Sequence, residues 1–152
     1  PGLNLLELIT LFAGLYNRPV QPMELLKLVN LADKAKNKYK EMSGGQKQRF
    51  SIATTLINQP RIVFLDEPTG GVDPVTRREF WNMIYQAADL GITVFVTTHY
   101  MDEAEYCNRV SIMVDGKIEA LATPRNLKTT FKAASMDEVF LQLARGAKRS
   151  AD

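Results

Sequence analysis

The chain has 152 residues, of which 45% are apolar and 24% charged, a composition typical of one globular domain and not of a disordered or collagen-like chain. Its 19 Lys and Arg residues oppose 17 Asp and Glu residues, so the formal charge of +2 does not favour non-specific nucleic-acid binding. The single cysteine, Cys107, cannot form an internal disulfide and favours a reducing, cytosolic compartment.

The strictly apolar stretches, such as residues 62–65, are far shorter than the roughly 18 residues that a membrane-spanning helix needs. The first residues carry no initiating Met, and no basic segment followed by an apolar one as in a signal peptide. We therefore expect no membrane span, and a chain that starts within a domain.

Leucine-rich patterns at helical spacing predict helices in the first forty residues, with a break between Pro19 and Pro22. The inward positions are Leu5, Leu8, Ile9 and Phe12 before the break, and Leu25, Leu28 and Val29 after it. The alternating lysines of residues 34–40 are interpreted as a solvated face or loop.

Two short apolar runs, residues 62–65 and 92–96, are bounded by turn signals and predict parallel strands buried on both faces. Between them, Asp73 is placed to cap a helix whose first residue is Pro74, and Gly91 is placed to end it. The pattern is that of one strand, helix and strand unit.

The runs at residues 110–114 and 117–121 predict a hairpin across Asp115-Gly116 that closes the sheet with an antiparallel edge. Beyond Pro124, the spacing of Val139, Phe140 and Leu143 predicts one face of a terminal helix.

Ser43-Gly44-Gly45-Gln46 precedes a helical run with apolar Phe50, Ala53 and Ile57. One interpretation is a helix cap, with Ser43 as N-cap and Gln46 as its capping-box partner. The other is a phosphate site, because two glycines let an anion approach the exposed amides at the positive end of the helix.

Acidic and histidine side chains follow the two predicted parallel strands directly. Asp66-Glu67 comes after the first, and His99 follows the second through Thr97-Thr98. The carboxyl ends of parallel strands form the usual ligand edge of an open α/β sheet. Asp66 could hold a hard cation such as Mg²⁺ and Glu67 could deprotonate a water. The alternatives are a solvated acidic loop and a structural histidine.

These segments together resemble the ATPases of ATP-binding cassette (ABC) transporters. Residues 42–49, Met-Ser-Gly-Gly-Gln-Lys-Gln-Arg, resemble the LSGGQ signature with Met42 in place of the common Leu. Residues 62–67 resemble the Walker B strand with its catalytic glutamate, residues 68–73 the approach to the D-loop, and Thr98-His99 the switch histidine. Residues 67–74, 99–105 and 135–141 are similar to exporter-type ATPases that pair with ABC-2 permeases.

The resemblance implies a role for each matching residue. Ser43, Gly44, Gly45 and Gln46 would bind the γ-phosphate of an ATP molecule held by a partner subunit, and Asp73 would lie across the dimer interface. Asp66 would support Mg²⁺, Glu67 would polarise the attacking water, and His99 would sense the γ-phosphate.

The fold implied is α/β: an incomplete P-loop NTPase (RecA-like) core with a mostly parallel sheet and a helical subdomain. We expect a helical signature subdomain over residues 1–57, a core over 58–123 and a helical tail over 124–152. The implied function is the ATP-hydrolysing motor of an ABC transporter, which pairs with a second nucleotide-binding domain and a permease on the cytoplasmic face of the membrane.

The phosphate-binding Walker A motif, Gly-x-x-x-x-Gly-Lys-[Ser/Thr], does not occur; the one Gly-Lys pair, Gly116-Lys117, falls in the predicted hairpin. We therefore expect this chain alone to be inactive, with a gap in its sheet where the family has its central strand. Alternatives are an ABC ATPase of DNA repair or translation, and a truncated, non-catalytic cassette that supplies only the signature face.

Overall fold

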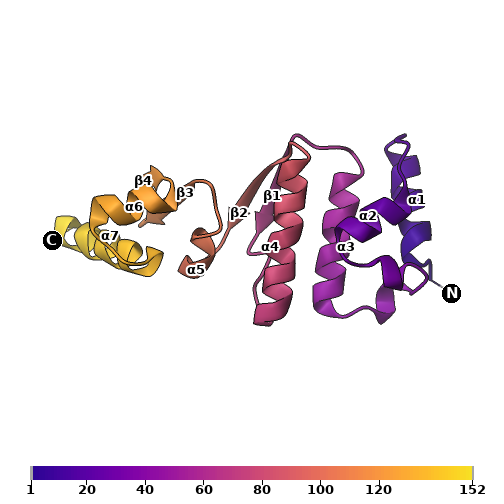
Figure 1. Ribbon diagram of the computed structural model, residues 1–152, viewed down its shortest axis with the longest axis horizontal. Helices are drawn as coiled ribbons and strands as arrows, with labels where there is room; N and C mark the ends of the chain where they lie inside the picture. Colours follow the sequence, from indigo (N-terminus) through magenta and orange to yellow (C-terminus); the bar gives the residue numbers. More distant parts are fainter. Residues whose placement is uncertain (1, 152) are drawn as a thin grey trace. The chain divides into compact units, whose positions relative to one another are not determined.

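Figure 1 shows the computed structural model, which describes residues 2–151 and the side chains of residues 2–146. Residues up to Thr97 form one compact unit, and residues from Thr98 onward form a second. Each unit contains its own two-stranded sheet. The division expected from the sequence, 1–57, 58–123 and 124–152, stays a prediction, and its outermost residues 1 and 152 lie outside the described part of the chain.

Helices that pack against one another form the first part of the first unit. They are α1 (Leu5–Leu15), α2 (Pro22–Leu28) and α3 (Gly44–Leu56), with the 3₁₀ turns Ala32–Lys34 and Tyr39–Glu41 between α2 and α3. Of the predicted apolar positions, six are buried and four are half-buried: the buried ones are Leu5, Ile9, Val29, Phe50, Ala53 and Ile57, and the half-buried ones are Leu8, Phe12, Leu25 and Leu28. The expected helices are therefore confirmed, because their apolar stripes remove side chains from water.

The fourth helix, α4 (Pro74–Asp89), begins at the predicted cap. One carboxylate oxygen of Asp73 accepts hydrogen bonds from the Val75 and Thr76 amides, both at 3.0 Å, and the other accepts from the Thr76 hydroxyl at 2.6 Å. The helix ends before Gly91, whose φ of +84° is a left-handed conformation that glycine adopts without strain. Both predicted ends of this helix are confirmed.

The strands β1 (Ile62–Asp66) and β2 (Thr93–Thr97) pair in parallel, as predicted. Their register aligns Ile62 with Thr93 at one end and Asp66 with Thr97 at the other. The connection between them runs through α4, which is the crossover that a parallel pair requires. The last residues of the two strands therefore lie opposite each other at the same edge.

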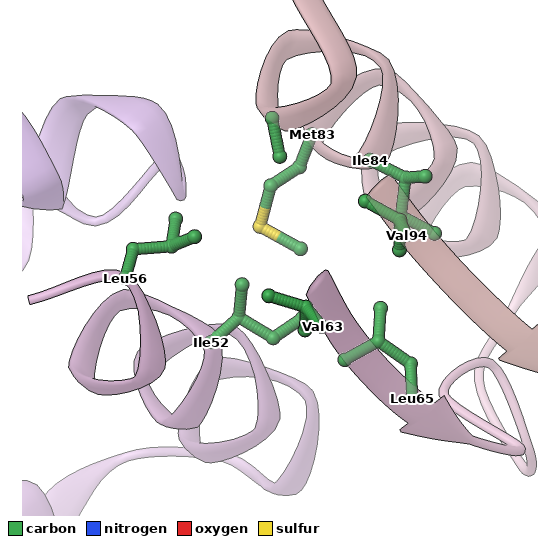
Figure 2. A pocket seen from close by; sticks show the side chains of 8 residues that line it. Ile52, Leu56, Val63, Leu65, Met83, Ile84 and Val94 are labelled. Carbon is green, nitrogen blue, oxygen red and sulfur yellow. The ribbon is translucent and has the colours of Figure 1, made fainter. Parts of the chain in front are cut away.

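One face of this sheet is covered by helices. Val63, Leu65 and Val94 line a small apolar pocket together with side chains of two helices (Figure 2). Those side chains are Ile52 and Leu56 of α3, and Met83, Ile84 and Ala87 of α4. The sheet is thus anchored by aliphatic burial on this side.

The opposite face of the sheet is exposed, which corrects the prediction that both strands are buried on both faces. Ile62 is 53% exposed, Phe64 73% and Phe95 52%. The two phenyl rings contact each other with centroids 5.6 Å apart. The physical reason is that α3 and α4, whose side chains meet the strands, do so on the Val63 face, so alternate residues reach solvent.

In the part of the chain that the structure describes, the second unit consists of a hairpin and three helices. They are α5 (Met101–Ala104), β3 (Val110–Val114), β4 (Lys117–Ala122), α6 (Pro124–Phe131) and α7 (Met136–Ala151). The hairpin turns at Asp115 and Gly116, whose φ values of +48° and +78° match the predicted tight turn. In the described chain this hairpin is a separate sheet, so the prediction that it closes the parallel sheet is wrong.

The core of the second unit lies between the hairpin and its helices, where Ala104, Ile112, Leu127, Met136 and Val139 are buried together. The predicted terminal helix is confirmed, because the side chains of residues 140 and 143 pack partly buried against this cluster.

Among the helices of the described residues, none combines the length and the apolar character that crossing a membrane requires.

The exposed phenyl rings of β1 and β2 generate a prediction about association. Contiguous exposed apolar surface favours self-association in water. We expect the chain to form oligomers as its concentration rises, and the double variant Phe64→Thr/Phe95→Thr to remain closer to a monomer in light scattering. Threonine keeps a residue suited to a strand, so the sheet itself should persist.

The control is Tyr16→Thr, which removes another aromatic side chain that is 51% exposed but lies outside the sheet. This control should leave the association unchanged. Association that is equal in the double variant and the original chain would show that the sheet face is not the contact.

The cap of α4 generates a prediction about pH. The hydroxyl and then the amide of Thr76, with the Val75 amide, hold the pKa of Asp73 below its ordinary value of 3.8. A lowered pKa in the folded state stabilises the fold above the ordinary pKa, and this contribution is lost as pH falls through the lowered value. The melting temperature of Asp73→Ala should therefore fall below that of the original chain at about pH 6, and the difference should shrink as the pH falls below the ordinary pKa of 3.8.

The matched control for this titration is Asp89→Ala, which removes a carboxylate at the other end of the same helix without removing its cap. A difference between Asp73→Ala and the original chain that does not change with pH would contradict an electrostatic contribution from the cap.

Candidate functional site

The start of α3 is the first part of the candidate site. The Ser43 hydroxyl accepts a hydrogen bond from the Gln46 amide at 3.3 Å, and the Gln46 side-chain oxygen accepts one from the Ser43 amide at 3.0 Å. The predicted capping box is therefore present. It holds the Gly44-Gly45 backbone in the first helical turn, where amides have no acceptor within the helix.

The fold itself gives no reason for the two glycines. A Cβ atom added at Gly44 would meet nothing within 4 Å, and one at Gly45 would meet only the Thr76 methyl at 3.6 Å, an ordinary contact. Neither glycine is among the residues with positive φ. Because glycine is less favourable than alanine in a helix, the pair is better explained by something that approaches the backbone closely.

The predicted acidic pair lies at the carboxyl end of β1 and is exposed to solvent. The Thr97 hydroxyl donates a hydrogen bond to one carboxylate oxygen of Asp66 at 2.5 Å. The same hydroxyl accepts from the Glu67 amide at 3.1 Å, and the Thr97 carbonyl oxygen accepts from that amide at 3.1 Å as well. The structure therefore brings Asp66 and Glu67 together around a threonine that the sequence analysis did not single out.

Glu67 has a φ of +43°, which is the left-handed conformation that non-glycine residues seldom adopt. A tight loop follows, in which the Gly70 amide donates to the Glu67 carbonyl at 3.0 Å. Thr69 is fully buried within this loop. The loop leads directly to the Asp73 cap, so the acidic pair and the start of α4 are joined by an ordered turn.

The starts of α3 and α4 are neighbours. Gly45 lies beside Thr76, the residue whose hydroxyl and amide bind Asp73. One turn further along, the Arg49 guanidinium forms a 3.0 Å ion pair with Glu79, and the Arg49 side chain is only 13% exposed. This pairing could not be predicted from the sequence, since residues thirty apart give no local signal. The ion pair holds α3 against α4, so the first turn of α3 with its cap (residues 43–46, the signature turn) lies next to the turn that Asp73 caps.

His99 lies in the second unit, just before α5. Its ring contacts that of Tyr100, with centroids 4.1 Å apart, and the Tyr100 amide donates to the Thr98 hydroxyl at 3.0 Å. The other predicted site residues belong to the first unit. The structure thus gives His99 an exposed position on the segment that follows β2.

The residues present fit a magnesium ion that arrives with a ligand. Among the described residues, no group of three or more His, Cys, Asp or Glu side chains could hold a metal by itself. Mg²⁺ characteristically binds through one or two carboxylates together with substrate phosphates. The exposed carboxylate of Asp66 at a strand end meets that requirement, whereas it could not by itself retain a structural metal.

Comparisons with known proteins agree with this geometry. A family profile described as ABC transporter matches residues 7–70, a range that includes the signature turn and the acidic pair. The chain is 48% identical over 108 residues to the probable multidrug ABC transporter ATP-binding protein YbhF of Escherichia coli, covering 68% of the chain and 19% of that protein. It is 44% identical over 124 residues to a fluoroquinolones export ATP-binding protein of Mycobacterium tuberculosis, covering 80% of the chain and 41% of that protein.

Solved structures show the same fold. The ATP-binding subunit of an ABC transporter superposes with a TM-score of 0.71 at 26% identity, covering 93% of this chain and 62% of that one. An ATP-binding cassette in its ADP conformation superposes with a TM-score of 0.65 at 24% identity, covering 81% of this chain and 51% of that one. The chain thus spans less than half of these curated relatives and under two thirds of these solved chains. It belongs to the ATP-binding proteins of ABC transporters and carries part of their ATP-binding cassette.

Proposed function

We propose that this chain is the signature-bearing part of an ATPase that drives transport across a membrane, with hydrolysis at a head-to-tail interface between two nucleotide-binding domains. The observation that carries the proposal is the glycine pair at the start of α3, which the fold does not require. A γ-phosphate would be bound there by the amides of the first turn and the positive end of the helix dipole.

The residues of the signature turn would recognise an ATP molecule held by a partner subunit. Ser43, Gly44 and Gly45 would donate to the γ-phosphate, and Gln46 would keep the turn in shape through its bond to the Ser43 amide. Asp73, which caps the neighbouring helix, would lie across the interface from that partner. The contact between Gly45 and Thr76 supports this grouping, because it keeps the two turns side by side.

The strand-end residues would carry the hydrolysis of the ATP bound by their own subunit. Asp66 would hold Mg²⁺, which when bound neutralises the phosphate oxygens. Glu67 would orient a water molecule and accept its proton. His99 would sense the γ-phosphate through a hydrogen bond.

The chain alone would not turn over ATP. It contains no Gly-x-x-x-x-Gly-Lys-[Ser/Thr] segment, and Gly116 of its Gly-Lys pair lies in a hairpin turn at φ +78°. The lysine and the cradling amides that neutralise the β- and γ-phosphates are therefore not supplied by these residues. A non-catalytic cassette that lends only its signature face to another subunit remains a second candidate on this observation.

A permease and the cytoplasmic face of the membrane complete the proposal. Exposed leucines of α1 and the preceding segment, among them Leu3, Leu11 and Leu15, line a shallow groove on the helical part of the first unit. A helix of the permease would bury these side chains. The relatives named for multidrug and fluoroquinolone export favour a transporter over ATPases of DNA repair or translation.

The proposed base predicts the effect of Glu67→Gln in the full-length protein that contains this chain. The amide cannot accept the proton of the attacking water, so turnover should fall by roughly 10²- to 10⁴-fold. The melting temperature and the binding of a fluorescent ATP analogue should stay the same, because the replacement keeps the size of the side chain.

Glu24→Gln is the control for this experiment, since Glu24 is an exposed residue of α2 that forms an ion pair with its neighbour Lys27. It should leave turnover unchanged. Normal turnover in Glu67→Gln would remove this residue from the proposed role.

The glycine pair predicts that stability and activity respond in opposite directions. Gly45→Ala should leave the stability of the fold unchanged or raise it by up to about 1 kcal/mol, since alanine is the better helix residue and finds room. The added methyl group would stand where the phosphate approaches the backbone, so ATP turnover of the full-length protein should fall at least tenfold. Thermal unfolding and ATPase assays measure the two effects.

Gly146→Ala in α7 is the matched control, because a Cβ atom added there meets nothing within 4 Å and so, like the one at Gly45, finds room. It should leave turnover at the original level. Full activity in Gly45→Ala would argue against a phosphate at the signature turn.

A further inference from the structure

We propose that Thr97 is a positioning residue for the acidic pair: its side-chain hydroxyl holds the Asp66 carboxylate and the Glu67 backbone in the arrangement that hydrolysis uses. This inference rests on the proposed function of the pair. Thr97 lies outside every motif by which the sequence resembles its family.

The strand register brings the threonine to the acidic pair. Thr97 is the last residue of β2 and is aligned with Asp66, the last residue of β1. A hydroxyl has one hydrogen to donate and lone pairs with which to accept. Here the hydrogen goes to the Asp66 carboxylate, and a lone pair receives the Glu67 amide at 3.1 Å. One hydroxyl thus joins the two residues that the proposal assigns to metal and water.

Each bond of the hydroxyl has a separate consequence. The bond to Asp66 engages one carboxylate oxygen and fixes the rotation of the group, so the other oxygen is presented in a constant direction. The bond to Glu67 adds to that of the Thr97 carbonyl oxygen, so the Glu67 amide has two acceptors on the same residue. Glu67 is held at a φ of +43°, a conformation that surrounding contacts must maintain.

The side-chain type suits this task. Threonine is branched at Cβ, which restricts its χ1 rotation and so limits where the hydroxyl can lie. Valine has nearly the same shape without the hydroxyl, and serine has the hydroxyl without the branch. The chain also offers a matched position, because Thr93 occupies the first residue of the same strand, where it is aligned with Ile62.

The backbone pairing of β1 and β2 does not need the hydroxyl, since it is made by main-chain bonds along the whole register. If Thr97 had only a structural role in the sheet, its replacement would therefore change the melting temperature and not the kinetic constants. A positioning role would affect kcat and the Mg²⁺ concentration needed for turnover, while the KM for ATP stays close to its original value.

The experiment compares Thr97→Val, Thr97→Ser and Thr93→Val in the full-length protein, with Glu67→Gln measured alongside. We expect Thr97→Val to lower kcat by roughly 10- to 100-fold, the range found when a partner of a metal-binding residue is removed. Thr97→Ser should restore most of this loss, and Thr93→Val should match the original protein. In the full-length protein without metal, the Glu67 amide should exchange its hydrogen with solvent faster in Thr97→Val than in Thr93→Val.

Each other outcome overturns the inference in a distinct way. If Thr97→Val keeps the kcat and the Glu67 amide exchange rate of the original protein while Glu67→Gln is inactive, the proposed function stands and Thr97 has no part in it. Equal losses of kcat in Thr97→Val and Thr97→Ser, accompanied by a lower melting temperature in both, would assign the threonine a structural role only. Normal turnover in Glu67→Gln would remove the proposed function and the inference together. Should Thr97→Val fail to fold, Thr97→Ala deletes the same hydroxyl without adding apolar surface, and the same criteria apply.

Discussion

The parallel pairing of β1 with β2 is the constraint on which the first unit depends. Main-chain hydrogen bonds set the register, and burial of Val63, Leu65 and Val94 against α3 and α4 holds the pair in place. Because side chains alternate along a strand, a shift of one residue would turn this buried face outward. The same register aligns Asp66 with Thr97, so apolar packing on one face determines polar geometry at the strand ends.

Helix caps provide the second level of organisation. Ser43 and Asp73 each bind amides of a first helical turn, and the two turns lie side by side through Gly45 and Thr76. The ion pair between Arg49 and Glu79 joins the same helices with little solvent access to the arginine, so it is screened less than a surface pair. The first turns of α3 and α4, each formed by residues close together in the sequence, thus lie beside each other in the first unit.

The exposed face of the parallel sheet follows from the same packing. The helices that bury Val63 leave Phe64 and Phe95 in solvent, although both are large aromatic side chains. Parallel sheets are usually covered on both faces, because their crossover helices pack there. An apolar face of this kind is consistent with a chain that represents part of a cassette.

Much of the fold and the site could be predicted from the sequence, because the signals are local. The caps at Ser43 and Asp73, the stop at Gly91 and the turn at Asp115-Gly116 depend on residues within a few positions of one another. The motifs around Asp66 and His99 identified the family for the same reason.

Tertiary structure alone decided which distant residues meet and which faces are covered. The bond from Thr97 to Asp66 spans 31 positions, and the pair of Arg49 with Glu79 spans 30, so no local pattern encodes either contact. The prediction that β1 and β2 are buried on both faces was wrong because an apolar run states what could be buried, not which neighbours are present to bury it. The amino-acid sequence therefore determined the elements, their ends and the chemical groups of the site, whereas packing between elements determined the register, the exposed face and the threonine beside the acidic pair.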